Sequence, residues 1–296
     1  MGAILIDGKK VAAEVKEGLL PRIKALKEKG VTPGLAAVIV GDDPASVTYV
    51  ESKSRACQNL GLYSEVIRKP AGLSEKELLS IVRELNLNKK IHGILVQSPL
   101  PSHIDELRVT LEIDPMKDVD GFHPHNVGLM VLGRGTLLPC TPHGILKLLA
   151  HYRIETRGME VVVVGRSNIV GKPIAMLLAQ KGKGADSTVT IAHSQSRNLG
   201  EITQRADILI VATGRPGTIT GEMIKEGAVI VDVGVNRIDD RMNPKGYRLT
   251  GDVDFKECAE RASYITPVPG GVGPMTIAML MSNTVTAAES ACSDLR

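Results

Sequence analysis

A chain of 296 residues is long enough for two domains of ordinary size, each with its own hydrophobic core. Charged residues make up 23% of the chain and the formal net charge is only +3, which indicates neither a nucleic-acid groove nor a polybasic membrane surface. We therefore expect small-molecule partners, no nucleic acid and no membrane.

The first half of the chain alternates helical and strand patterns. Hydrophobic periodicity predicts a helix over 7–29, a strand over 35–40, a helix from the Gly41 turn to 61, a strand over 65–67, a helix over 74–85 and a strand over 93–96. Ser74 and Glu77 have the spacing of a capping box at the start of the helix over 74–85. The alternation predicts one α/β domain, followed by an irregular loop over 113–124.

The domain boundary is expected near a connecting helix over 141–152, with Thr141 as its N-cap and Pro142 at its first position. We therefore predict a catalytic domain over 1–140 and a second domain over 141–274. The apolar helix over 275–291, within the C-terminal segment 275–296, is expected to pack back onto the first domain.

The second half is organised around Met159–Pro173, where four valines precede a glycine turn and an apolar helical pattern. Such a valine run is typical of a parallel strand buried on both faces. Further strands are predicted over 188–192, 206–211, 228–231 and 264–266, separated by segments of helical length. The alternation predicts an α/β fold with a Rossmann-type parallel sheet, which binds ligands at the carboxyl ends of its strands.

The glycine turn predicts a dinucleotide site. The N-terminus of the helix after it offers unpaired amides and a positive dipole to a phosphate. The motif Gly165-x-Ser167-x-x-x-Gly171 departs from the usual fingerprint, because serine replaces the second glycine and the third lies one residue further on. The alternative is a buried strand followed by a glycine turn that binds nothing.

The end of the second predicted strand indicates which dinucleotide is bound. An NAD site places an acidic residue there to hold the ribose 2′-hydroxyl, whereas a 2′-phosphate needs positive charge and hydroxyl donors. This chain has His193-Ser194 at that position and Arg166 in the glycine turn. We therefore predict an NADP site with Arg166 and Ser194 on the 2′-phosphate, while Arg197 either assists or is merely solvated.

Tyr49 and Lys53 lie four residues apart and project from one face of the second helix. The alternative is an exposed helix that happens to carry both. Short-chain dehydrogenases have the same spacing, but their pair follows the glycine turn, whereas here it precedes Gly165 by a whole domain. We assign the pair to a substrate domain that faces the cofactor across a cleft, with Gln97 at the mouth of its sheet.

Metal binding is not expected. His123 and His125 form a His-x-His pair without a third ligand at a metal spacing, and the four cysteines form no Cys-x-x-Cys pair. Free thiols are typical of a reducing cytoplasm, and no apolar run approaches the length of a membrane span. Asp118 and Asp120 lie in the irregular loop, where aspartates commonly cap turns.

Five motifs, in the same order along the chain, resemble those of the bifunctional methylenetetrahydrofolate dehydrogenase/methenyltetrahydrofolate cyclohydrolase (FolD) family. They are Gly41-Asp-Asp-Pro-Ala-Ser-x-x-Tyr49-Val-x-x-Lys53, Val96-Gln97-x-Pro-Leu-Pro101, Lys117-Asp-Val-Asp-Gly-Phe-His-Pro124, Gly165-Arg-Ser-x-Ile-Val-Gly171 and Pro269-Gly-Gly-Val-Gly-Pro-Met-Thr276. The resemblance covers essentially the whole chain. Ser98 and Val47-Thr48 depart from the family pattern and remove no chemical group that the reaction needs.

The resemblance implies NADP-dependent oxidation of 5,10-methylenetetrahydrofolate to the 5,10-methenyl form and its hydrolysis to 10-formyltetrahydrofolate, in a homodimer. It further implies that Lys53 and Gln97 form the catalytic pair, that Tyr49 lines the folate site and that Asp120 anchors the pterin. Substrate contacts would also come from Pro269, Gly270 and Gly271, and cofactor contacts from Gly165, Arg166, Ser167, Ser194 and Val235. The alternatives are a monofunctional dehydrogenase and a non-catalytic NADP-binding sensor.

Overall fold

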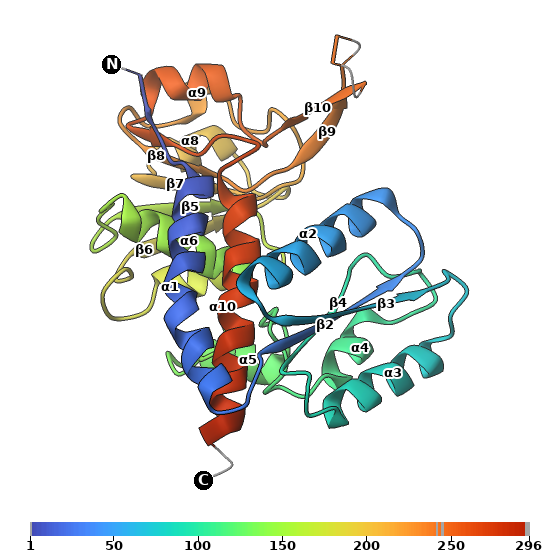
Figure 1. Cartoon of the computed structure of the whole chain (residues 1–296). Helices are drawn as coiled ribbons and strands as arrows, with labels where there is room; N and C mark the ends of the chain where they lie inside the picture. Colours follow the sequence, from blue (N-terminus) through green and yellow to red (C-terminus); the bar gives the residue numbers. More distant parts are fainter. Residues whose placement is uncertain (1, 241, 244–245, 294–296) are drawn as a thin grey trace. The chain divides into compact units, whose positions relative to one another are not determined.

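The structure is a computed structural model that describes residues 2–240, 242–243 and 246–293. The chain divides into two compact units, each formed by two segments of the sequence. Residues 13–140 and 277–296 form what we call the three-stranded unit, and residues 1–12 and 141–276 form the six-stranded unit. Each unit is built on its own sheet (Figure 1).

The three-stranded unit contains a parallel sheet in the order β3-β2-β4. The strands are β2 (Gly34–Val40), β3 (Tyr63–Lys69) and β4 (Gly93–Val96), as predicted from the sequence. Because β3 and β4 lie on opposite sides of β2, the connections reverse direction at the carboxyl end of β2. In open parallel sheets, this reversal is where ligands bind.

Both faces of β2 are covered by helices, which explains why all seven of its residues are buried. Leu35, Ala37 and Ile39 pack into one core cluster with helices α1 (Gly8–Glu28), α2 (Pro44–Leu60) and α10 (Val272–Ser293). The alternate residues pack into another cluster with α3 (Glu75–Leu87) and α4 (Glu106–Glu112). Figure 1 shows α2 on one side of this sheet and α3 and α4 on the other.

The signals that were predicted to begin and end these helices act as expected. The Ser74 hydroxyl accepts from the Glu77 N–H while the Glu77 carboxylate accepts from the Ser74 N–H, so the capping box is complete. Helix α2 begins after Asp43, whose carboxylate accepts from the Ser46 N–H, and ends at Gly61 in a left-handed conformation with φ of 68°. Glycine adopts this conformation without steric cost.

The six-stranded unit is a parallel sheet in the order β1-β11-β8-β7-β5-β6. Its strands are β1 (Ile4–Leu5), β5 (Glu160–Val164), β6 (Thr188–Ala192), β7 (Ile208–Val211), β8 (Val229–Asp232) and β11 (Tyr264–Ile265). Strands β6 and β7 flank β5, so here too the connections reverse direction, at the carboxyl ends of β5 and β7. The predicted parallel α/β sheet is confirmed. Strand β1 was not predicted, because two residues are too few to show an alternating pattern.

Helices and short turns of helix join these strands. They are α6 (Cys140–His151), α7 (Gly171–Leu178), α8 (Leu199–Thr203), the 3₁₀ turn η1 (Gly221–Met223) and α9 (Phe255–Arg261). One core cluster joins Val162 and Val164 to Leu209 and Val211 of the neighbouring strand β7, and to buried residues of α9 and of the segments that flank η1 and α9. The other face of β5 is covered as well, since Val161 and Val163 are fully buried.

Further features differ from the sequence prediction. Helix α6 begins at Cys140, so Thr141 is not its N-cap; the Thr141 hydroxyl instead shares a hydrogen bond with Thr276. Helix α10 begins at Val272, three residues before the predicted start, because proline is tolerated in the first turn of a helix. An unpredicted antiparallel hairpin, β9 (Asn236–Asp239) with β10 (Tyr247–Thr250), follows β8.

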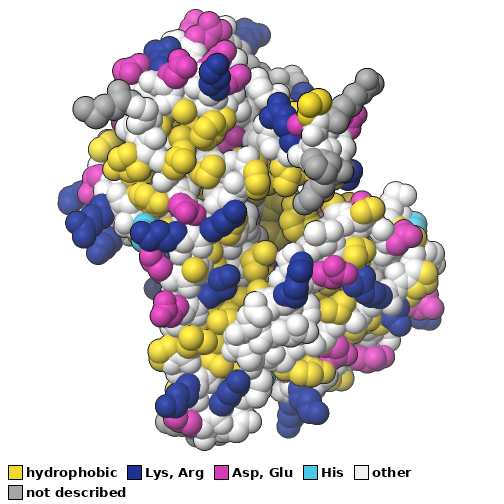
Figure 2. Space-filling model, turned by 45° about the horizontal axis from the view of Figure 1, so that its top comes forward, with side chains coloured by type: hydrophobic (Ala, Val, Ile, Leu, Met, Phe, Trp, Pro, Cys, Tyr) yellow, Lys and Arg dark blue, Asp and Glu magenta, His cyan; other side chains and the backbone are white. Residues whose placement is uncertain are grey.

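A short helix, α5 (Pro124–Val131), follows the irregular loop that was expected over 113–124. Across the described parts of the chain, no helix is both long and apolar enough to cross a membrane. Lysine, arginine, aspartate and glutamate side chains are interspersed over the face drawn in Figure 2.

Candidate active site

Lys53 and Gln97 meet at the carboxyl edge of the three-stranded sheet. Lys53 projects from α2, the helix after β2, and Gln97 directly follows β4. The Lys53 Nζ donates to Gln97 Oε1 at 2.9 Å. The Gln97 Nε2 donates to the Ser98 carbonyl at 2.6 Å, so this amide has its oxygen turned toward the lysine. The structure thus brings together two predicted site residues that lie 44 positions apart.

Tyr49 lies one helical turn before Lys53 on α2 and leaves 47% of its surface exposed. The same helix buries Val50, Ala56, Cys57 and Leu60 on its other face. Its ring is therefore available for contact with a ligand beside the lysine.

Asp120 is held in place by the loop that precedes α5. Residue 118 forms a parallel bridge to Ile94 of β4, so the loop runs along the edge of the three-stranded sheet. The buried Asp118 carboxylate accepts from the N–H groups of Gly121, Phe122 and His123 and from Asn126 Nδ2. Asp118 therefore acts as the turn-capping aspartate that was considered in the sequence, and it fixes the backbone on both sides of Asp120.

The carboxyl group of Asp120 forms none of these capping bonds. Burial raises the pKa of Asp120 to about 6, the positive charge of Lys53 opposes that shift, and the negative charge of Asp118 adds to it. An acid and a lysine are thus electrostatically coupled within one site. Perturbed carboxyl groups beside a specific charge partner are typical of functional sites.

Asn283 was not singled out from the sequence and supports this loop. It lies on α10, and its Nδ2 donates to the carbonyl oxygens of Val119 and Leu138, each at 2.8 Å. The available sequence signal was an amide side chain in a mostly apolar helix, where a polar group needs a hydrogen-bond partner once it is buried. His123 also has a structural role, because its Nδ1 accepts from the His125 N–H at the start of α5. Among the described residues, no group of three or more His, Cys, Asp or Glu side chains is arranged to hold a metal ion.

The turn after β5 forms the predicted strand–turn–helix unit. Gly165 has φ of 133°, and a Cβ atom there would collide with the Ala212 carbonyl. Gly171 is needed for a similar reason, because its Cβ would collide with the Gly165 carbonyl. The Ser167 hydroxyl accepts from the Val170 and Gly171 N–H groups at the start of α7. The two glycines and the serine thus let the turn and the helix approach closely.

Several groups of this turn face solvent. Arg166 and Ser167 are exposed, and the N–H groups of residues 166–169 take part in none of the hydrogen bonds of the described structure. Unpaired amides before a helix, together with a guanidinium group, are suited to bind an anion. Two other predicted cofactor residues, Ser194 after β6 and Val235 after β8, are exposed at the same carboxyl edge.

The predicted site residues therefore separate by unit. Tyr49, Lys53, Gln97 and Asp120 belong to the three-stranded unit, and the six-stranded unit contains Gly165, Arg166, Ser167, Ser194, Val235 and Pro269–Gly271. Gly270 has φ of 112°, and the Gly271 N–H donates to the Pro267 carbonyl at 2.8 Å, so the glycine loop is tightly turned.

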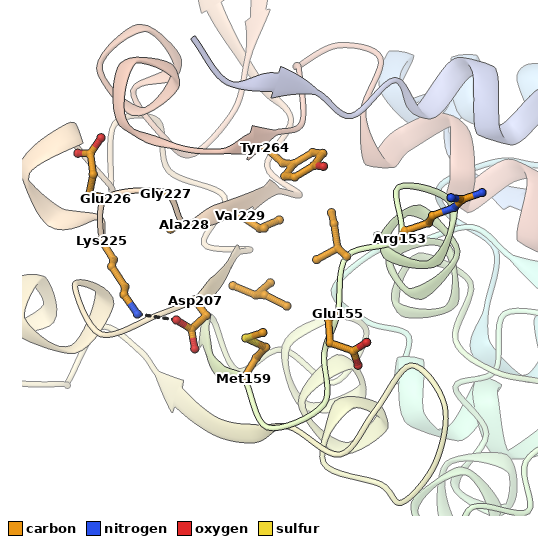
Figure 3. Close-up of a pocket in the computed structure, with 12 residues that line it drawn as sticks. Arg153, Glu155, Met159, Asp207, Lys225, Glu226, Gly227, Ala228, Val229 and Tyr264 are labelled. Atoms are coloured by element: carbon orange, nitrogen blue, oxygen red, sulfur yellow. Dashed lines mark hydrogen bonds and ion pairs between the residues drawn. The ribbon is translucent and has the colours of Figure 1, made fainter. Parts of the chain in front are cut away.

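A pocket of about 350 Å³ lies at the opposite edge of the six-stranded sheet. Figure 3 shows Met159, directly before β5, and Val229, the first residue of β8, together with Tyr264, Arg153 and the Lys225–Asp207 ion pair. Ligands of parallel sheets bind beyond the carboxyl ends of the strands. The pocket therefore does not coincide with the predicted dinucleotide site.

These features define a class of protein: a dinucleotide-binding α/β enzyme that carries a lysine, an amide and a carboxyl group in a separate unit. Residues 139–292 match the NAD(P)-binding domain of tetrahydrofolate dehydrogenase/cyclohydrolase, and residues 6–120 match the catalytic domain of that family. The chain therefore belongs to the tetrahydrofolate dehydrogenase/cyclohydrolase family.

Full-length relatives agree with this assignment. The chain is 57% identical over 285 residues to the bifunctional protein FolD of Prosthecochloris aestuarii, with 95% of this chain and 97% of the relative covered. The FolD structure from Campylobacter jejuni is 46% identical with a TM-score of 0.92, covering 98% of this chain and 99% of that one. The Trypanosoma brucei FolD, in complex with NADP and an inhibitor, is 39% identical with a TM-score of 0.94 and 99% coverage of both chains.

Proposed function

We infer that this protein oxidises 5,10-methylenetetrahydrofolate with NADP and hydrolyses the 5,10-methenyl product to 10-formyltetrahydrofolate. The observation that carries this inference is the Lys53–Gln97 hydrogen bond of 2.9 Å beside the perturbed carboxyl group of Asp120. Family membership supports both activities, since the two family domains together span most of the chain. A sensor without catalytic activity would have no use for a lysine that is held by an amide near a carboxyl group.

The residues of the six-stranded unit fit NADP. Gly165 and Gly171 let the turn pack closely against its neighbours, and the unpaired N–H groups of residues 166–169 are suited to bind a pyrophosphate. The segment after β6 is His193-Ser194 and offers no carboxylate to a ribose 2′-hydroxyl, while Arg166 is exposed in the turn. We assign Arg166 and Ser194 to the 2′-phosphate, and Gly165, Ser167 and Val235 to the rest of the dinucleotide. When bound, NADP supplies the hydride acceptor.

Lys53 is assigned to the hydrolytic step. Water must lose a proton as it attacks the methenyl carbon, and a ring nitrogen must gain one as it leaves, so a positioned acid/base is required. The hydrogen bond to Gln97 holds the lysine nitrogen in one place at the end of the sheet. Oxidation needs no proton transfer to the protein, because the positive charge left by hydride departure is shared by the two folate nitrogens.

Asp120 is assigned to binding the pterin. Its carboxylate can accept together from the amide N–H and the amino group at the pterin edge. Tyr49 is assigned to the folate site beside Lys53, and Pro269, Gly270 and Gly271 to its border. On this assignment, Asp120→Ala impairs both reactions, and loss of only one would show that the anchoring role is wrong.

The experiment is an assay of the purified chain with methylenetetrahydrofolate and either NADP or NAD, followed by the absorbance of methenyltetrahydrofolate. A second arm supplies methenyltetrahydrofolate without a nucleotide. We expect oxidation with NADP in the first arm and hydrolysis in the second. Oxidation without hydrolysis would identify a monofunctional dehydrogenase, and NADP binding without either reaction would identify a sensor.

We further propose that the protein is a cytoplasmic homodimer. The family resemblance supports the dimer, and the edge strand β6 lies beside α7, which exposes part of Met176. The cytoplasm is supported by the four cysteines, all of them free and three of them buried. Light scattering of the purified chain tests the dimer, because a mass near 31.6 kDa would show a monomer instead.

A further inference from the structure

Two buried aspartates lie beneath the carboxyl edge of the six-stranded sheet. Asp232 is the last residue of β8 and is 2% exposed; Asp252 follows β10 and is fully buried. Buried carboxylates are costly unless they are paired or hydrogen-bonded, so both need an explanation. Neither was singled out from the sequence, and none of the roles assigned above uses them.

Asp232 holds Asp252. Its carboxylate accepts from the backbone N–H groups of Asp252 and Val253, at 3.0 and 3.1 Å, and from the Gly234 N–H at 3.0 Å. The Thr266 hydroxyl accepts from the Asp232 N–H at 2.7 Å. Gly251 makes room for this contact, because a Cβ there would collide with the Asp232 carboxylate. The backbone at Asp252 is therefore fixed from the end of β8.

Asp252 in turn ties together two loops. Its Oδ2 accepts from the N–H groups of Thr213 and Gly214, at 2.6 and 2.9 Å, in the loop after β7. Its Oδ1 accepts from Asn236 Nδ2 at 2.8 Å, in the segment after β8. Gly234 is required beside it, since a Cβ there would collide with the Asp252 carboxylate.

These two loops border the predicted cofactor site. The loop after β7 faces the Gly165 turn across the point where the strand connections reverse, and Ala212 packs against Gly165. The segment after β8 carries the exposed Val235. The Asp252 carboxylate is the direct link between the Thr213–Gly214 backbone and the Asn236 side chain, which also donates to the Gly251 carbonyl at 3.1 Å.

We propose that Asp252, oriented by Asp232, is a positioning residue that holds the two loops in the conformation that binds NADP. The inference rests on the proposed function, since it takes NADP as the ligand at this edge. Asp252 does not touch the cofactor in this role. It contributes by preorganisation, because loops ordered before binding lose less conformational freedom when the ligand arrives.

A negative charge at Asp252 would by itself repel the phosphates of NADP. The carboxylate is, however, fully buried and accepts three hydrogen bonds, two from backbone amides and one from an asparagine. Such donors stabilise the negative charge and offset its field. Positioning and repulsion predict opposite results for removal of the carboxylate, which makes the proposal testable.

The test uses full-length Asp252→Asn and Asp252→Ala, with Asp254→Ala as the matched control. Asp254 lies two residues further on and also accepts a backbone N–H, from Glu257 at 3.0 Å, but it caps α9 instead of the two loops. Calorimetry measures the Kd for NADP, thermal unfolding measures Tm, and hydrolysis of methenyltetrahydrofolate without nucleotide measures the integrity of the other unit.

We expect the Kd for NADP to rise roughly tenfold in Asp252→Ala and by less in Asp252→Asn, which retains one acceptor. The rate of hydrolysis should stay within about twofold of the parent rate, because substitutions at sites without shared partners act nearly independently. The control should lower Tm and leave the Kd unchanged. If Asp252→Ala does not fold, the Kd of Asp252→Asn for NADP tests the proposal alone.

An unchanged Kd with a lower Tm would show that Asp252 is only structural, and a lower Kd would show that charge repulsion dominates. Equal losses of NADP binding and of hydrolysis would indicate general damage; each of these three results overturns the proposal. Failure of the parent protein to bind NADP would instead refute the proposed function.

Discussion

The two units use the same sheet geometry for different chemistry. In each, parallel strands on both sides of a central strand create a reversal at the carboxyl edge, and the candidate residues lie at that edge. In the three-stranded unit the working groups are side chains, namely Lys53, Gln97 and Asp120. In the six-stranded unit they are mainly backbone amides and glycines of the turn after β5.

This difference follows from what each partner requires. Proton transfer needs a titratable group at one position, which only a side chain supplies. A pyrophosphate is bound by several backbone N–H groups at once, such as the unpaired amides of residues 166–169 before α7. Substitutions in the two units should therefore separate hydrolysis from cofactor use.

The largest effect is expected from Lys53→Met, which keeps most of the side-chain length and removes the proton carrier. Hydrolysis should fall by about 10²–10⁴-fold, the usual contribution of a general acid/base, with a markedly smaller loss of oxidation. Methenyltetrahydrofolate should then accumulate, which its absorbance reports during oxidation. Parallel losses of both activities would mean that Lys53 mainly binds or orients folate.

The next effect is expected in the other unit. Arg166→Ala removes an exposed guanidinium group beside the unpaired amides of the turn, and should raise the KM for NADP roughly ten- to a hundredfold. Weak use of NAD should change little, because NAD lacks the 2′-phosphate. Initial rates with each nucleotide measure the two effects. Equal use of NAD and NADP by the parent enzyme would contradict the assignment.

Gly165→Ala sharpens the contrast, since it adds only a methyl group. The Cβ would collide with the Ala212 carbonyl at a φ of 133°, and backbone strain of about 1–3 kcal/mol should weaken NADP binding roughly tenfold. Hydrolysis without nucleotide should persist. The control is Gly184→Ala, which also has a positive φ but no atom within 4 Å of the new methyl group. Similar NADP affinities in the two variants would show that close approach at Gly165 is unimportant.

The smallest expected effect is the pH dependence due to Asp120. Because its pKa is raised to about 6, the carboxyl group is protonated below that pH and ionised above it. If the ionised form binds the pterin, kcat/KM for hydrolysis should fall as pH decreases, to about half of the plateau at pH 6. Asp120→Asn should lower the plateau and abolish this inflection. An inflection that survives in Asp120→Asn would have to come from another group.

Much of the fold was predicted because its signals are local. The valine run of β5, the capping box of α3 and the glycine at the end of α2 depend on residues a few positions apart. The start of α6 was predicted wrongly, because Thr141 has a partner, Thr276, that lies 135 positions away. The β9–β10 hairpin and β1 were missed, since their strands are only four and two residues long.

The sequence by itself determined the residue types of the site and their order along the chain, since Tyr49 and Lys53 share a helical face and Gly165 ends a strand that must be buried. Tertiary structure decided what those residues meet. It brought Gln97 within hydrogen-bond distance of Lys53, raised the pKa of the Asp120 carboxyl group, and used Asn283 and Asp252 to hold the loops. These contacts depend on which strands lie side by side, and helical or strand periodicity carries no information about partners that are distant in the chain.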